Sequence, residues 1–145
     1  MQWIENWYND FTMSQNIKFT ALFVKDVEDL LKRFPPKHKK VFGHHSTILF
    51  EPENLDGIET GKEYSVKIIG RAWDEFGDDL LVENIKSKNK YPHITLSRGD
   101  NAPPLYSKIL FEKAIATKNI EYFNNEKVEV IEGYSDGKND ILKQD

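Results

Sequence analysis

The sequence predicts a single α+β domain. Its 145 residues and 39% hydrophobic composition suit one soluble domain with its own core. Short segments of strand composition outnumber the helical ones and follow one another through turns, which is typical of antiparallel pairing. No linker, repeat or low-complexity segment divides the chain. We therefore expect one domain over residues 1–145, with an N-terminal helix over 1–13 and a polar, disordered tail over 135–145.

Three segments carry helix signals. Residues 2–11 place aromatic side chains at helical spacing. Asp26 is a suitable N-cap for a helix that runs to about Phe34, where two prolines stop it. The Pro103-Pro104 pair precedes a helix over 107–116.

Seven segments have the composition of β-strands, because they are short runs of β-branched and aromatic residues between turn formers. We expect strands over 17–24, 42–50, 62–69, 79–85, 91–97, 119–123 and 127–131. Gly77-Asp78 should form a turn that leads into the fourth of these strands. The acidic residues beside that turn are expected at a solvated hairpin tip; they are Asp74, Glu75, Asp78 and Asp79.

Composition excludes several function classes. The chain has no cysteine, so it has no disulfide, thiolate metal site or cysteine nucleophile, which fits a reducing cytoplasm. Apolar runs such as 21–24 fall far short of the ~20 residues that cross a bilayer. Residues 1–6 lack the features of a signal peptide. We expect a cytoplasmic protein with no membrane partner.

The net charge of −4 argues against broad binding to nucleic-acid backbones, and no duplex DNA binding is expected. A compact site for one nucleotide or one strand end is compatible with this charge, because only local charge matters there. The basic loop over 37–40 would attract phosphate, although such a loop is usually only solvated. His38 in that loop is expected to be a solvated surface residue.

A repeated tripeptide is the most informative feature. His45-Ser46-Thr47 and His93-Ile94-Thr95 both read His-x-Thr within predicted strands. Alternate side chains of a strand share a face, so each histidine lies beside its threonine while the residue between them faces the other way.

The same alternation places Ser97 on the face of His93 and Thr95. His44 should point away from His45 and support packing, although a shift of one residue in register would exchange the roles of these two histidines.

Two imidazoles that face one cleft suit acid–base catalysis. An imidazole has an ordinary pKa of ~6.5, so near neutral pH one ring can accept a proton while the other donates one. The hydroxyls of Thr47 and Thr95 can hydrogen-bond phosphate oxygens and hold phosphorus between the two rings. The sequence has no His-x-His or Glu-x-x-His pattern at these positions, so we expect neither a metal nor another cofactor.

Two His-x-Thr motifs on strands are the signature of the 2H phosphoesterase superfamily, which this chain resembles over roughly residues 19–116. The matching segments are 42–47 (FGHHST) and 91–97 (YPHITLS). Residues 103–107 (PPLYS) are similar to the region after the second motif in the cyclic phosphodiesterase domain of fungal-type tRNA ligases and its stand-alone and phage relatives.

The resemblance implies a bilobal fold with flanking helices, in which two antiparallel sheets surround a central groove. It also implies metal-independent hydrolysis of a nucleotide or RNA phosphodiester that involves a ribose 2′-oxygen, either a 2′,3′-cyclic phosphate or a 2′–5′ linkage. Phage members of the superfamily degrade cyclic nucleotide signals of bacterial immunity, which is an alternative function in a host cytoplasm. The residues carried over as catalytic are His45, Thr47, His93 and Thr95.

Four further residues are candidates for substrate binding. Tyr106 and Trp73 can stack on a base, Tyr91 precedes the second motif, and Ser97 continues its face. Trp73 ends an alternating strand, so ordinary packing explains it equally well.

Two non-enzymatic functions stay open. One is a nucleotide-binding module without turnover, which the two complete motifs disfavour. The other is an interaction protein that docks through an N-terminal aromatic surface. That surface would consist of Trp3, Trp7, Tyr8 and Phe11.

Overall fold

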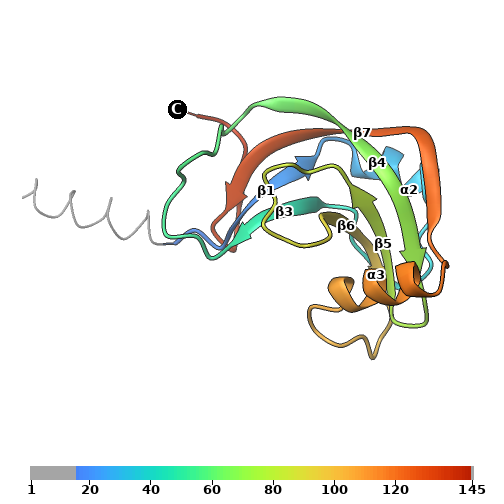
Figure 1. Ribbon diagram of the computed structural model, residues 1–145. Coiled ribbons are helices and arrows are strands. Elements are labelled where there is room, and N and C mark those ends of the chain that lie inside the picture. The colour runs from blue at the N-terminus through green and yellow to red at the C-terminus, as the bar shows by residue number, and fades with distance from the viewer. Residues whose placement is uncertain (1–15, 145) are drawn as a thin grey trace, which may run out of the picture.

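A computed structural model of the protein describes residues 16–144 and has an α+β fold (Figure 1). Its elements are β1 (Phe19–Val24), α2 (Val27–Arg33), β2 (Lys40–Val41), β3 (His45–Phe50), β4 (Glu63–Trp73), β5 (Gly77–Val82), β6 (His93–Arg98), α3 (Ser107–Ala116), β7 (Glu121–Ser135) and β8 (Asp140–Ile141). The predicted N-terminal helix and its aromatic surface lie outside the described residues. Within residues 16–144, no helix is long and apolar enough to span a bilayer.

The strands of the described region form one antiparallel sheet in the order β2-β6-β5-β4-β7-β1-β3, with β8 paired to β7. The resemblance implied two separate sheets. A single sheet arises because the two long strands, β4 with 11 residues and β7 with 15, pair with each other and so join β2, β6 and β5 on one side to β1 and β3 on the other. The two long strands arch over the others in Figure 1, so the sheet curls into a half-barrel.

The curl brings the two ends of the sheet close together. The segment after β2 continues along β6, where the Gly43 N–H donates to the Thr95 carbonyl at 2.8 Å. One residue later the chain has crossed to β1, because the His44 carbonyl accepts from the Val24 N–H at 2.9 Å. This crossing places β3 near β6, although β3 is the last strand in the sheet order and β6 is the second.

The main core fills one face of the sheet, beneath α2. Alternation places Ile48 of β3 and Ile94 and Leu96 of β6 in that core, so their neighbours point to the opposite face. The other buried members are Leu22, Val24, Leu30, Phe34, Val66, Ile68, Leu80, Val82, Val128 and Val130. A smaller cluster on the opposite face holds α3 through Leu110 and Phe111.

Both described helices follow local signals that the sequence predicts. The Asp26 side chain caps α2 by accepting from the Asp29 N–H at 2.9 Å, and the helix ends at Arg33, with Phe34 as its C-cap before the two prolines. The predicted range 107–116 matches α3. The capping bond satisfies a backbone donor that would otherwise lack a partner, which is typically worth about 1 kcal/mol.

The C-terminal part of the chain differs from the prediction. The two expected late strands are a single strand, β7. The predicted disordered tail instead makes a turn, in which the Asp136 carboxylate accepts from the Lys138 and Asn139 N–H groups. The turn leads into β8, where Asp140 pairs with Ser135 of β7.

The acidic segment after β4 also differs from the prediction. The turn centres on Asp74, whose carboxylate accepts from the Phe76 and Gly77 N–H groups, and β5 already begins at Gly77. Asp78 and Asp79 are fully buried rather than solvated. Each is neutralised by an arginine, Asp78 by Arg71 and Asp79 by Arg98, because an unpaired carboxylate in the interior would be costly.

Candidate active site

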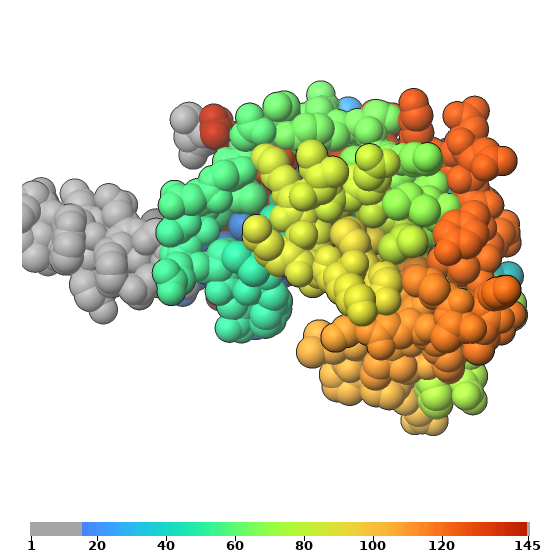
Figure 2. All heavy atoms as spheres, viewed as in Figure 1, coloured from blue at the N-terminus to red at the C-terminus, as the bar shows by residue number. Residues whose placement is uncertain are grey.

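A groove of about 720 Å³ opens on the face of the sheet that carries α3. It is lined by Phe42, His44, His45, Thr47, Phe50, Asn89, Lys90, Tyr91, His93, Thr95, Arg98, Leu105, Tyr106, Ser107 and Lys108. Figure 2 shows a recess at the lower edge of the molecule, between the teal atoms of the β3 region and the orange atoms near α3. All four side chains of the two His-x-Thr motifs therefore lie in one groove.

His45, the first residue of β3, is half-buried against an aromatic wall. Its ring stacks on Phe19 of β1, with ring centroids 4.6 Å apart. Burial, the largest cause, and the neighbouring His44 together lower the pKa of His45 from 6.5 to about 4, although Asp140 opposes the change. A weaker effect of His93 acts in the same direction as burial. His45 is therefore neutral at pH 7 and can accept a proton.

His44 does not point away from His45, so the prediction for this residue is wrong. Its Nδ1 lies 2.8 Å from His45 Nδ1, and its Nε2 lies 2.8 Å from Asp140 Oδ2. The alternation rule fails because His44 precedes the first residue of β3, and Gly43 has a positive φ of 73°. Neighbouring side chains of an irregular segment can share a side.

His93, the first residue of β6, is oriented by the backbone. Its Nδ1 lies 2.7 Å from the carbonyl oxygen of Tyr91. A carbonyl only accepts hydrogen bonds, so His93 Nδ1 carries a proton and Nε2 is the nitrogen that can exchange one. The ring also contacts Phe111 of α3, with centroids 6.2 Å apart.

Ser97 is not in the groove, although strict alternation would place it beside Thr95. A β-bulge changes the register between β5 and β6: Asp79 pairs with Thr95, whereas the preceding Asp78 pairs with Ser97. The Ser97 side chain is fully buried and donates to Asp78 Oδ2 at 2.7 Å. Arg98 takes its place in the groove.

Arg98 brings positive charge into the groove and is itself held firmly. Its guanidinium pairs with the buried Asp79 and donates to Ser107 Oγ at 2.7 Å. Lys90 and Lys108 also line the groove. Within residues 16–144, the groove lining includes no aspartate or glutamate, which contrasts with the net negative charge of the chain. An anionic ligand is favoured here.

The predicted aromatic contacts are only partly in place. Tyr91 lines the groove. Tyr106 lines it too but is 5% exposed, and its hydroxyl donates to Asp74 Oδ2. Trp73 lies outside the groove lining, with the Lys37 ammonium 4.8 Å from its ring centroid.

The sequence pattern did not reveal the exposed apolar side chains of the groove. Phe42, Phe50 and Leu105 are all exposed, and all three line it. The predicted strand over 42–50 places Phe42 on the face opposite His45, whereas β3 begins only at His45, and Leu105 lies in no predicted strand. These two aromatic rings and the leucine side chain can pack against the apolar parts of a ligand whose charge is held by the cationic groups.

His38, the remaining one of the four histidines of the chain, lies outside the groove lining. His38 is half-buried rather than solvated, because its ring nitrogen donates to the Asp74 carbonyl at 2.7 Å and its backbone N–H donates to Ser97 Oγ at 3.1 Å. Its backbone bond holds the segment before β2 against β6, and its ring bond holds that segment against the turn between β4 and β5.

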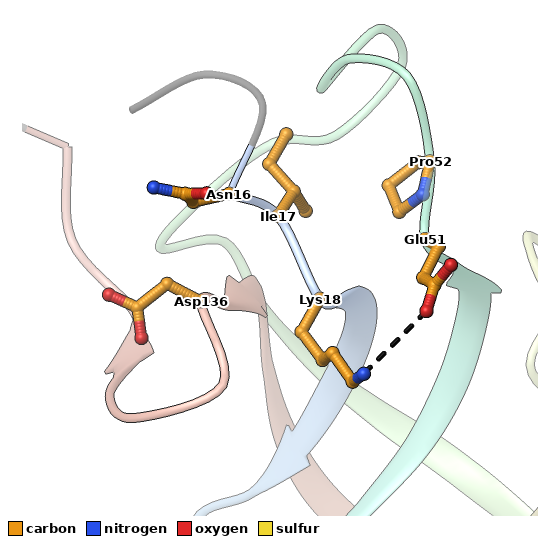
Figure 3. Close-up of a pocket in the computed structure, with 6 residues that line it drawn as sticks. All are labelled: Asn16, Ile17, Lys18, Glu51, Pro52 and Asp136. Carbon is orange, nitrogen blue, oxygen red and sulfur yellow. Dashed lines mark ion pairs between the residues drawn. The ribbon is translucent and has the colours of Figure 1, made fainter. Parts of the chain in front are cut away.

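A second hollow lies near the start of β1 (Figure 3). Its charged groups already have partners: Lys18 pairs with Glu51 at 3.6 Å, and the Asp136 carboxylate accepts backbone N–H groups. It contains no histidine, so it lacks the acid–base groups of the groove. Across residues 16–144, the groove included, no group of three or more His, Cys, Asp or Glu side chains is placed to hold a metal ion.

Comparison of the chain with family models, with curated proteins and with solved structures finds no match.

Proposed function

We propose that the protein is a metal-independent phosphodiesterase that uses His45 and His93 as a general acid–base pair. One observation carries the proposal: both His-x-Thr motifs line a single groove whose charged lining residues are cationic. A phosphodiester is an anion whose cleavage needs one proton removed and one supplied. The groove offers two titratable rings for this exchange and positive charge for the phosphate.

The proposed reaction is hydrolysis by direct attack of water on phosphorus. A neutral histidine takes a proton from water as the water oxygen bonds to phosphorus. The bond from phosphorus to the leaving ribose oxygen breaks, and the protonated second histidine donates its proton to that oxygen. The two rings thus exchange protonation states and return to the start through solvent. Each proton transfer typically contributes ~10²–10⁴-fold to the rate.

The hydroxyls of Thr47 and Thr95 are the proposed ligands of the nonbridging phosphate oxygens. Each threonine is two residues from its histidine on the same strand face, so a phosphate held by both hydroxyls lies between the two rings. Arg98 adds a guanidinium to the same wall. These contacts position phosphorus and stabilise the charge that develops on it.

The proposed substrate class is a nucleotide or RNA phosphodiester that involves a ribose 2′-oxygen. The resemblance to 2H phosphoesterases supports this class, and the exposed Phe42 and Phe50 at the groove suit stacking on a base. A 2′,3′-cyclic phosphate, a 2′–5′ oligonucleotide and a cyclic oligonucleotide signal all present a phosphodiester to the two histidines and need similar acid–base chemistry. A substrate panel separates them.

The test is incubation of the purified protein in EDTA with these nucleotides, with products identified by mass spectrometry. We expect one class to be hydrolysed, and His45→Ala and His93→Ala each to lower kcat by ~10²–10⁴-fold. His38→Ala is the matched control, because that histidine lies outside the groove lining. Calorimetric binding without any product would instead indicate a nucleotide-binding module and contradict the proposal.

A further inference from the structure

We infer that Asp140 and His44 are positioning residues that fix the tautomer of His45, so that His45 is the general base and His93 the general acid. This inference rests on the proposed function and extends it, because the two His-x-Thr motifs alone do not distinguish the two rings. Asp140 and His44 belong to neither motif. Their role follows from a chain of hydrogen bonds that runs from β8 to the groove.

The chain begins at Asp140. Its Oδ2 lies 2.8 Å from His44 Nε2. A carboxylate can only accept, so the hydrogen of this bond belongs to His44 Nε2. A neutral His44 then has no proton left for Nδ1, and that nitrogen is an acceptor.

The next link fixes His45. The Nδ1 atoms of the two rings lie 2.8 Å apart, which is hydrogen-bond distance, and one of them has to donate. Since His44 Nδ1 is the acceptor, His45 Nδ1 carries the proton. The remaining nitrogen of a neutral His45, Nε2, therefore has a free lone pair and can take a proton from water.

The surroundings of His45 favour its neutral form. The rings of Phe19 and Phe23 on β1 contact it and have no charge. The titratable groups that act on it are His44 beside it, Asp140 on β8 and His93 on β6. Their combined effect with burial is a pKa of about 4, so His45 enters the reaction without a proton to give.

His93 has a different environment. Its Nδ1–H donates to the neutral Tyr91 carbonyl, and its Nε2 can carry a second proton into the reaction. With His45 as the base, the proton for the leaving oxygen comes from His93. Both rings carry a proton on Nδ1 and leave Nε2 free, so the tautomer makes each ring able to act but does not separate their roles. The apolar wall of Phe19 and Phe23 disfavours a charged His45, which makes His45 the base and leaves His93 as the acid.

The arrangement depends on a neutral His44. If His44 is also protonated on Nδ1, it becomes the donor, and a neutral His45 then carries its proton on Nε2 and cannot act as a base. Asp140→Asn should also disturb the tautomers of His44 and His45. The asparagine amide can donate as well as accept, so it no longer dictates which His44 nitrogen carries the proton.

Nitrogen-15 NMR of the histidine rings at pH 8 tests the inference without any substrate. We expect His45 to carry its proton on Nδ1 and a free lone pair on Nε2, with its signals assigned by their loss in His45→Ala. Asp140→Asn should yield a mixture of the two tautomers, and Asp140→Glu should restore the wild-type pattern. A wild-type His45 protonated on Nε2, or an unchanged tautomer in Asp140→Asn, would overturn the inference.

Kinetics provide the second readout. In Asp140→Asn, kcat should fall by about 10-fold, which is less than the ~10²–10⁴-fold that a general base contributes, because part of His45 keeps the productive tautomer. The charge of Asp140 raises the pKa of His45, so its removal should also move the acidic limb of the pH–rate profile to lower pH. A purely structural role would lower the rate without moving that limb. Asp56→Asn removes an exposed carboxylate outside the groove lining and should change neither.

The two proposals fail in different ways. If no nucleotide is hydrolysed but His45 has the expected tautomer, the proposed function is wrong and the hydrogen-bond chain stands. If a nucleotide is hydrolysed while wild-type His45 carries its proton on Nε2, the assignment of the base is wrong and the phosphodiesterase stands.

Discussion

Arg98 and Asp79 form an ion pair beneath the groove, with Arg98 Nη2 3.2 Å from Asp79 Oδ2 and the carboxylate fully buried. The arginine side chain is 14% exposed and lines the groove. Asp79 thus fixes the orientation of a cation that the proposal places against the phosphate. Removing either partner leaves the other charge without compensation in a poorly solvated place.

Asp79→Asn should therefore lower the free energy of unfolding by about 3–5 kcal/mol, as is typical when one partner of a buried pair is removed. Urea denaturation measures this change. Glu28→Gln is the control, since Glu28 forms an exposed pair with Lys32 and its loss should cost less than about 1 kcal/mol. Equal effects of the two substitutions would contradict the importance of the buried pair.

Thr47→Val and Thr95→Val should each lower kcat/KM by about 10- to 100-fold. The physical reason is the loss of one hydrogen bond to a charged phosphate oxygen, which is worth about 1.5–3 kcal/mol. Valine keeps the shape of the side chain, so thermal unfolding should change little. Thr117→Val, in the exposed residue after α3, is the control and should leave kcat/KM unchanged. Wild-type kcat/KM in both motif variants would show that the two hydroxyls take no part in the mechanism.

Phe50→Ala should raise KM by roughly 5- to 100-fold at nearly constant kcat, because base stacking on an aromatic ring is worth about 1–3 kcal/mol. Phe50 is 59% exposed, so its loss should not disturb the core. Tyr122→Ala, which removes a ring that is 62% exposed outside the groove lining, is the matched control. An equal change in KM for both variants would argue against stacking in the groove.

Stability should depend on pH through His45. Its pKa is about 4 in the folded protein and close to 6.5 when unfolded, so between these values the unfolded chain binds the proton more readily. The contribution of His45 is fully present above pH 6.5 and is lost as pH falls toward 4. The total loss is at most on the order of 3 kcal/mol.

Urea denaturation of wild type and His45→Gln at pH values between 4 and 8 measures this dependence. The difference in stability between the two proteins should shrink as pH falls from 6.5 to 4. A difference that stays constant across this range would show that His45 titrates normally in the folded state.

Local signals predicted several elements correctly. The Asp26 cap and the prolines after Phe34 define α2 without help from distant residues. Alternation within a strand was sufficient to pair each motif histidine with its threonine on one face. The structure then brings the faces of β3 and β6 to one groove.

Non-local pairing explains what the sequence did not reveal. The bulge that exchanges Ser97 for Arg98 depends on how β6 pairs with β5, which local composition does not encode. Asp140 lies in a polar segment that resembles a disordered tail, yet β7 holds it in place. Gly133 of β7 allows this approach, because a side chain there would collide with the Ile141 carbonyl. Polar composition alone gave no sign of this pairing.

The most direct test of the central claim compares the rates of nucleotide hydrolysis in EDTA by wild type, His45→Ala, His93→Ala and the double variant. If both rings act on one phosphorus, each single variant loses ~10²–10⁴-fold in kcat, and the double variant is little slower than the slower single variant. Wild-type turnover in either single variant would contradict a shared reaction centre.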